Sequence, residues 1–170
     1  MEADVDDFAR FVEARERALQ RTAWLLTGDW ALAEDLVQTA LARAWRRWDK
    51  ISRRDDPEIY VRRVMVNTWS TWRRRRWAGE VASGDLPDQP APGDVAAEVA
   101  ARQLVGHLLG GLTKKQRSVV VLRVFDDLSQ DQVAQILDCA VGTVKSTMAQ
   151  ALAKLRAEPR LAELMERRVR

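Results

Sequence analysis

The chain has 170 residues, of which 46% are apolar and 31% charged, and its formal net charge is +3 at pH 7. This length and apolar share allow one ordinary domain or two small ones, and they exclude wholesale disorder. A single cysteine and a single histidine exclude a disulfide framework and leave few groups for metal or nucleophilic chemistry, so we expect no metal, no cofactor and no enzymatic activity. The acidic start is unlike a signal peptide, and no apolar run is long enough to span a bilayer. We therefore expect a cytoplasmic protein that does not engage a membrane.

Apolar residues recur at helical spacing along the chain, and strand signals are absent, which predicts an all-α protein. A first helix is expected from about Asp7 to Leu26, with Gly28 as its stop, and a second follows a cap at Asp29. A third is expected to begin at Asp56–Pro57, where a capping residue precedes a proline. Together these helices are predicted to form a first domain over residues 1–77.

The second helix carries a long apolar stripe that we expect to be buried: Ala33, Leu36, Val37, Ala40, Leu41, Ala44, Trp45 and Trp48. Trp24 is also predicted to lie in the core. Trp69 is more consistent with the core than with a base-stacking surface, whereas Trp72 and Trp77 fit either interpretation.

Charge is distributed unevenly along the chain. Residues 43–76 contain twelve basic and four acidic residues, whereas residues 78–101 contain five acidic residues and no basic ones. Clustered positive charge suits a polyanion, because each neutralised phosphate releases counterions; the alternative is a solvated helix face. Tryptophans lie beside the run Arg73–Arg76, and this combination favours nucleic acid. The Pro- and Gly-rich residues 78–93 are predicted to form a flexible acidic linker.

Helical periodicity resumes near Asp94 and predicts a second helical domain over residues 94–158. Thr113 and Gln116 form a capping box before another helix, whose apolar residues are Val119, Val120, Leu122, Val124 and Phe125. Residues 159–170 begin with a proline and are predicted to be a short basic tail.

A helix-turn-helix is predicted near the end of this domain. Ser129 and Gln132 form a second capping box, Asp138 occupies a turn that favours left-handed backbone, and Val141 opens the next helix. In such a motif the second helix lies in a DNA major groove. Its apolar face is Val144, Met148, Ala151, Leu152 and Leu155.

Four segments are distinctive when taken together: Ala33–Ala40 (AEDLVQTA), Tyr60–Asn67 (YVRRVMVN), Leu112–Arg123 (LTKKQRSVVVLR) and Val141–Ser146 (VGTVKS). They resemble bacterial extracytoplasmic-function (ECF) sigma factors of the two-domain, group-4-like type, and they occur in the family's order. The resemblance implies a promoter-specificity subunit of RNA polymerase, with core polymerase and promoter DNA, duplex and melted, as partners. Many family members are also held by an anti-sigma factor, although nothing in the sequence identifies one.

The resemblance also implies three sets of site residues. The core-binding set is Asp35, Leu36, Gln38 and Thr39. The set for the minus-ten element is Arg62, Arg63, Asn67, Trp72, Arg73, Arg74, Arg75 and Arg76. The set for the minus-thirty-five element is Arg117, Thr143, Lys145, Ser146, Gln150 and Lys154. No catalytic residue and no metal ligand is expected.

Further expectations follow from the same resemblance. The segment from Asp49 to Asp56 would be a loop that holds a flipped base, and the linker would be either an RNA mimic in the polymerase cleft or a plain tether. Thr147 and Gln150 stand where family members commonly have arginines, so we expect modest affinity for the upstream element. The alternative functions are a free-standing helix-turn-helix regulator and a helical adaptor that binds only proteins.

Overall fold

The protein is described by a computed structural model that covers residues 2–54, 56–76, 95–161 and 163. Within these ranges all regular structure is helical, which confirms the all-α prediction. The predicted linker at 78–93, Trp77 and most of the predicted tail lie outside the described residues.

Helices α1 (Glu2–Thr27) and α2 (Trp30–Trp45) form a hairpin at the start of the chain. Helix α1 begins about one turn earlier than predicted, because acidic residues at a helix N-terminus interact favourably with the helix dipole and extend the helix beyond its first apolar residue. Gly28 ends it with a φ of 73°, as predicted. The Asp29 side chain accepts a hydrogen bond of 2.8 Å from the Leu32 amide and caps α2.

The apolar stripe of α2 is buried as predicted except at its end. Trp45 is 42% exposed, although its ring contacts the tilted ring of Phe8 at a centroid distance of 5.1 Å. Trp48 is buried, but it belongs to a separate helix, α3 (Trp48–Arg54). The chain turns at Arg46–Arg47, so the helical phase of α2 does not continue to Trp48. The predicted loop after Asp49 was therefore wrong, since the chain there is mostly helical.

Helix α4 (Pro57–Arg76) begins where the sequence predicts, with the Asp56 carboxylate accepting a hydrogen bond of 2.9 Å from the Glu58 amide. Trp69 is buried, which confirms its assignment to the core, and Trp72 is half-buried. The other fully or nearly buried apolar residues of this helix are Ile59, Val61, Met65 and Val66.

The second half of the chain contains α5 (Val95–Gly110), α6 (Lys114–Val120), a π-helical segment η1 (Val121–Phe125), α7 (Gln130–Leu137) and α8 (Val141–Arg156). Both predicted capping boxes, at Thr113 and at Ser129, are present. Val124 was expected in the apolar face but is 55% exposed. The wider π turn, closed by the bond from the Asp126 amide to the Val121 carbonyl at 3.1 Å, changes the angle per residue and turns Val124 outward.

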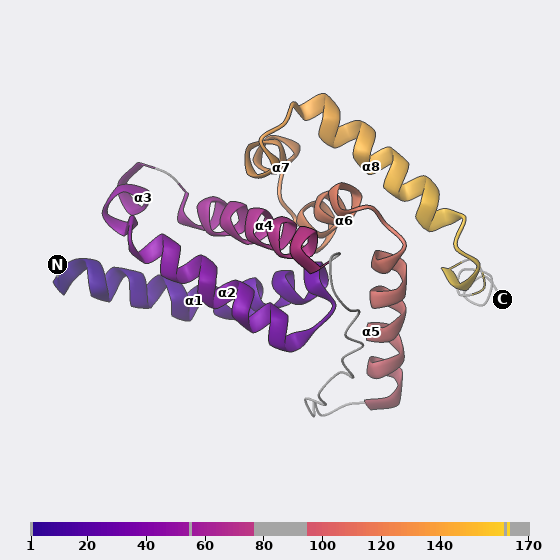
Figure 1. The fold of residues 1–170 in the computed structure, drawn as a ribbon, viewed down its shortest axis with the longest axis horizontal. Coiled ribbons are helices and arrows are strands. Elements are labelled where there is room, and N and C mark those ends of the chain that lie inside the picture. The colour runs from indigo at the N-terminus through magenta and orange to yellow at the C-terminus, as the bar shows by residue number, and fades with distance from the viewer. Residues whose placement is uncertain (1, 55, 77–94, 162, 164–170) are drawn as a thin grey trace.

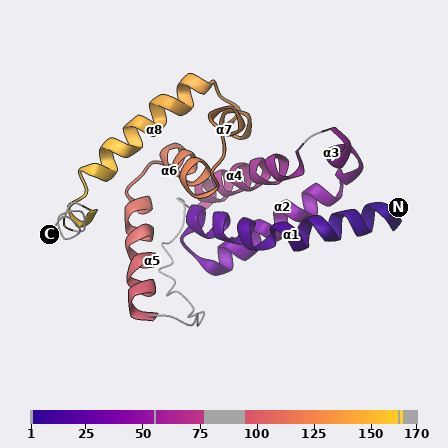
Figure 2. The same cartoon turned by 180° about the vertical axis from the view of Figure 1, so that it is seen from behind.

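The two halves pack against each other and share one apolar core. Helix α4 lies between the α1–α2 hairpin and the α6–α7 region, while α5 extends away at one end (Figures 1 and 2). Helix α4 contacts α7, and α1 contacts η1. A single cluster of buried apolar side chains continues from α1, α2 and α4 into α6, η1, α7 and α8. Two helical domains are thus present, and the contact between them is a feature that sequence periodicity did not predict.

Candidate polymerase and promoter interface

The predicted core-binding residues lie on two different sides of α2. Asp35 and Gln38 are exposed, Thr39 is half-buried, and Leu36 is completely buried. Helical geometry explains the division, because Leu36 belongs to the apolar face that packs on α1 and α4. Of these four residues, Asp35, Gln38 and part of Thr39 are accessible to a partner. Leu36 is buried beneath them in the apolar core.

The residues predicted for the minus-ten element follow α4 but differ in accessibility. Asn67 is exposed, while the Arg62 side chain is only 3% exposed. Arg63 is half-buried, and its Nη2 donates a hydrogen bond of 2.9 Å to the Gln135 carbonyl of α7. Arg73–Arg76 continue the helix, but their side chains lie outside the described part of the chain.

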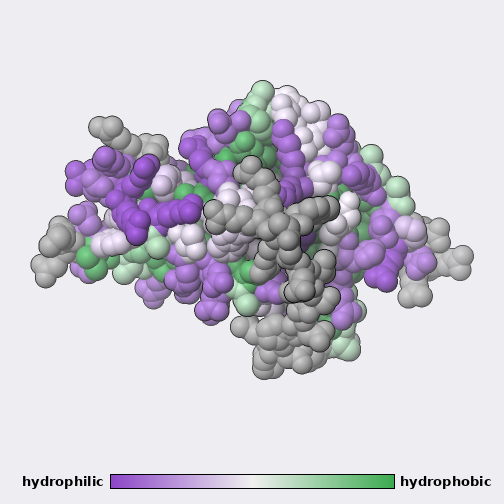
Figure 3. Space-filling view, in the orientation of Figure 1, coloured by the Kyte–Doolittle hydropathy of each residue, from purple (hydrophilic) through white to green (hydrophobic). Residues whose placement is uncertain are grey.

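A basic surface near α3 was missing from the predicted site. Arg46, Arg47, Lys50 and Arg53 are exposed on the turn between α2 and α3 and on α3 itself. The surface over α3 and the adjoining part of α4 is mainly hydrophilic (Figure 3). These residues were counted in the charge asymmetry, and that count was the signal that could have identified them. Sequence motifs could not identify this basic surface, because the turn between α2 and α3 that brings these residues together was not predicted.

The helix-turn-helix has the predicted local geometry. Asp138 ends α7 in a left-handed conformation with φ 51° and ψ 54°, and α8 starts three residues later. On α8, Lys145, Ser146, Gln150 and Lys154 are exposed, and Thr143 is half-buried. Thr143, Ser146, Gln150 and Lys154 follow one another at spacings of three or four residues and so lie along one side of α8, whereas Lys145 is exposed on the opposite flank.

Thr147 does not belong to that outer side. Its exposure is 6%, so it packs inside the domain with Val144 and Ala151 on the same helix. The expectation that Thr147 occupies an arginine-like contact position is corrected by this burial. Of the two positions that depart from the family pattern on α8, only Gln150 faces solvent.

Arg117 is also placed away from the outer side of α8. It is 7% exposed, and its Nε donates a hydrogen bond of 2.7 Å to the Leu25 carbonyl at the end of α1. The guanidinium also lies against Gly28, the residue that turns α1 into α2. In this conformation Arg117 links the two halves and is not presented to DNA.

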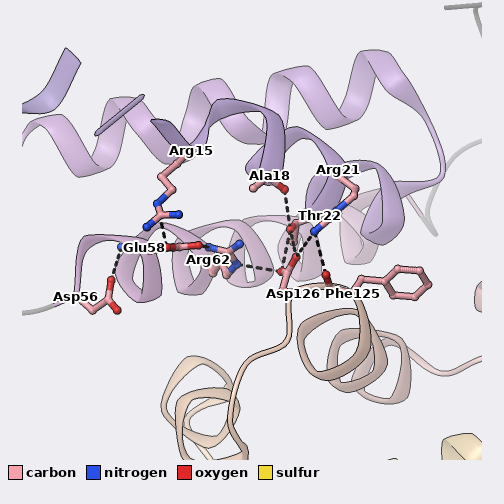
Figure 4. Close-up of polar contacts among 9 residues, drawn as sticks. All are labelled: Arg15, Ala18, Arg21, Thr22, Asp56, Glu58, Arg62, Phe125 and Asp126. Atoms are coloured by element: carbon pink, nitrogen blue, oxygen red, sulfur yellow. Dashed lines mark hydrogen bonds and ion pairs between the residues drawn. The ribbon is translucent and has the colours of Figure 1, made fainter. Parts of the chain in front are cut away.

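Asp126 occupies the centre of a polar cluster between the two halves (Figure 4). Its side chain is 0% exposed, and Oδ2 accepts a hydrogen bond of 2.9 Å from Arg62 Nε. The Thr22 hydroxyl lies 2.7 and 2.8 Å from the two carboxylate oxygens. Arg62 Nη1 also pairs with Glu58 at 2.5 Å, and Glu58 pairs with Arg15 at 3.2 Å. The buried Arg62 therefore has a carboxylate partner in each half of the chain, Glu58 in the first and Asp126 in the second.

Among the described residues, no group of three or more His, Cys, Asp or Glu side chains is placed to hold a metal ion. No described helix is both long enough and apolar enough to cross a membrane.

Family models match both halves of the chain. Sigma-70 region 2 matches residues 11–79, and Sigma-70 region 4 matches residues 102–155. The RNA polymerase sigma-E factor of Streptomyces coelicolor is 43% identical over 155 residues, covering 91% of this chain and 87% of the relative. The ECF RNA polymerase sigma factor SigL of Mycobacterium tuberculosis is 33% identical over 143 residues, covering 81% and 80%. The chain belongs to the ECF sigma factors.

This sigma factor also resembles a solved structure over both halves. The sigma factor RpoE of Bartonella quintana, in complex with the anti-sigma factor NepR, superposes with a TM-score of 0.72 at 26% identity, covering 89% of this chain and 95% of that one. As an ECF sigma factor, the protein directs promoter-specific transcription by RNA polymerase. The region 2 match contains α2 and α4, and the region 4 match contains the helix-turn-helix.

Proposed function

We propose that this sigma factor is a dissociable, non-catalytic subunit that acts in the cytoplasm, with α2 binding core polymerase, α4 opening the minus-ten element and α8 reading the minus-thirty-five element. The carrying observation is that one chain presents two separate polar surfaces, at Asp35 and Gln38 on α2 and at Lys145 to Lys154 on α8. Two surfaces on one polypeptide suit a subunit that must hold an enzyme and a DNA site at once.

The minus-ten activity rests on α4 and on the basic surface near α3. Asn67 is exposed and has the donor and acceptor needed for paired hydrogen bonds with an adenine edge. Arg73–Arg76 extend the same helix next to Trp72, and cations beside an aromatic ring suit an unpaired strand. The exposed Arg46, Arg47, Lys50 and Arg53 are added to this site as contacts to the DNA backbone.

The minus-thirty-five activity rests on α8. Thr143 and Gln150 are assigned to base edges, and Lys145, Ser146 and Lys154 to phosphates. The Ser146 hydroxyl donates to the Thr143 carbonyl at 3.1 Å, so it must rotate to reach DNA. Arg62, Arg63 and Arg117 remain assigned to DNA, but in the present conformation each is engaged by the other half of the chain.

An anti-sigma factor is a further partner in this proposal. The support is the superposition with the Bartonella protein, which was solved with its anti-sigma factor NepR. The pairing would control when the two polar surfaces become available to polymerase and DNA.

Transcription with purified components tests the main proposal. Bacterial core polymerase is incubated with fragments of the host genome, with and without the full chain, and the transcript starts are sequenced. We expect starts that depend on the chain and lie downstream of a shared pair of motifs. Core binding without any such starts would contradict the proposal, and so would duplex binding without core binding.

Substitution of Gln150 tests which side of α8 reads DNA. Gln150→Arg adds a cation to the exposed surface, so we expect tighter duplex binding at low salt and a salt slope steeper by about one. Thr147→Arg is the matched control, since it adds the same group at a buried position. That variant is expected to lose about 2 kcal/mol or more of stability without any gain in affinity. Fluorescence anisotropy over a salt series measures the slope, and a gain for Thr147→Arg alone would refute the assignment.

A further inference from the structure

Asp126 is a buried acid that connects the two halves of the chain. It follows the π-helical segment η1 of the second half, and its main contacts are Thr22 on α1 and Arg62 on α4, both in the first half. Arg21 of α1 also lies 4.0 Å from the carboxylate and is largely exposed. Figure 4 shows the carboxylate pointing toward both partners from the loop below them. The π turn places it there, because the Asp126 amide closes the wide turn onto the Val121 carbonyl.

The contact between the halves is reinforced where helices end. Helix α1 has no basic residue in its last turn, and Arg117 of the second half donates to the Leu25 carbonyl there. Helix α7 also lacks one, and Arg63 of the first half donates to the Gln135 carbonyl. A cation near a helix C-terminus satisfies free carbonyls and interacts favourably with the dipole. Each half therefore supplies a cation to the C-terminus of one helix in the other half, α1 or α7, whose own last turn has no basic residue.

The residues in these contacts are the cations assigned to DNA. Arg62 is held by the carboxylates of Asp126 and Glu58, and its side chain is only 3% exposed. The carboxylates occupy Nε and Nη1, and the packing that leaves the side chain 3% exposed keeps a phosphate from reaching the rest of the guanidinium. Binding of DNA by Arg62, Arg63 and Arg117 thus requires the halves to separate.

We propose that Asp126 is a latch: it holds the free chain in a closed form and withholds Arg62, Arg63 and Arg117 from DNA until the two halves part. The inference rests on the proposed function, which assigns these three arginines to promoter DNA. A charge pair suits a reversible latch, because opening returns both charges to water and recovers much of their hydration. Removing only the Asp126 charge destabilises the closed form, since the buried Arg62 then keeps Glu58 as its remaining counter-charge among the described residues.

Two variants test the latch, with one matched control. Asp126→Asn removes the charge that faces Arg62, and Thr22→Val removes the hydroxyl from the other side of the carboxylate. Asp127→Asn is the control, since it removes the same charge from the adjacent, exposed residue. Asp127 has a φ of 52°, a left-handed conformation that asparagine accepts.

The measurements are made on the full free chain, without polymerase. Small-angle X-ray scattering reports the radius of gyration, and anisotropy reports binding to a fluorescein-labelled single-stranded oligonucleotide. We expect a larger radius for Asp126→Asn and Thr22→Val and no change for Asp127→Asn. If the open form is a minor state, opening should strengthen apparent DNA binding by about tenfold relative to the control.

Three other results would contradict the latch. Equal radii for all four chains would overturn it, as would a larger radius without tighter DNA binding. Loss of the helical circular dichroism signal in both variants would overturn it too, because Asp126 would then be a requirement for folding. Failure of the proposed function is seen separately, as an absence of chain-dependent transcripts with core polymerase, whereas the radius is measured without polymerase or DNA.

Discussion

Replacing Asp35 with arginine is expected to weaken binding to core RNA polymerase by about thirtyfold or more, which corresponds to about 2 kcal/mol. Asp35 is exposed on α2 and lies within the Sigma-70 region 2 match. In the proposed function this carboxylate faces the core polymerase, where we expect a basic and apolar surface. Reversing the charge would then bring two cations together at an interface from which water is partly excluded. Titration of labelled core polymerase with the full chain measures the change.

Glu13→Arg is the control for this prediction. Glu13 is exposed on α1, within the same half of the chain, so the substitution makes the same change in net charge at a different surface. It should leave core binding within about twofold of the unsubstituted chain, since exposed charges far from a contact are screened by salt. Equal affinities for the Asp35 and Glu13 variants would remove Asp35 from the core-binding surface.

Replacing Arg73–Arg76 together with alanine is expected to abolish open promoter complexes while leaving core binding unchanged. Four consecutive arginines end α4, so the substitution removes a dense group of cations next to Trp72. Losing about four phosphate contacts would reduce DNA affinity by orders of magnitude at moderate salt. Permanganate reactivity of unpaired thymines on a promoter found in the transcription experiment measures opening, and titration of core polymerase measures assembly.

The four-lysine variant separates charge from geometry at the same positions. Lysine keeps the positive charge but lacks the planar fork of arginine, so we expect partial recovery of promoter opening. Normal opening by the four-alanine variant would show that Arg73–Arg76 do not contact the melted strand. Loss of core binding in that variant would assign these residues to the polymerase instead.

Local signals in the sequence were sufficient for most helix boundaries. The caps at Asp29, Thr113 and Ser129, the stop at Gly28 and the left-handed Asp138 all occur as predicted. Each depends on side chains and backbone within about four residues of one another, which is the range of capping and helical periodicity. The helix-turn-helix and the exposed side of α8 were predictable for the same reason.

Two of the errors occur where a helix changes its phase or ends at an unmarked turn, and a third concerns a residue in the middle of a helix. Trp45 was assigned to the core because it continues the spacing of the apolar stripe, but it is the last residue of α2 and the chain turns at Arg46–Arg47 directly after it. Val124 was assigned to an apolar face because an ordinary helix was assumed where a π turn occurs. Thr147 was assigned to the DNA side by comparison with the family, although its exposure depends on the packing of α8 on α6 and α7.

The sequence by itself determined the helices, the family and the kinds of partner, because caps, periodicity and motifs are local patterns that need no knowledge of the rest of the chain. Only the tertiary structure decided which cations are free. Arg62 and Asp126 are 64 residues apart, and Arg117 and Leu25 are 92 apart. Whether such residues meet depends on how the two halves pack, and that is decided by the shared core and by the need to pair charges that the core buries.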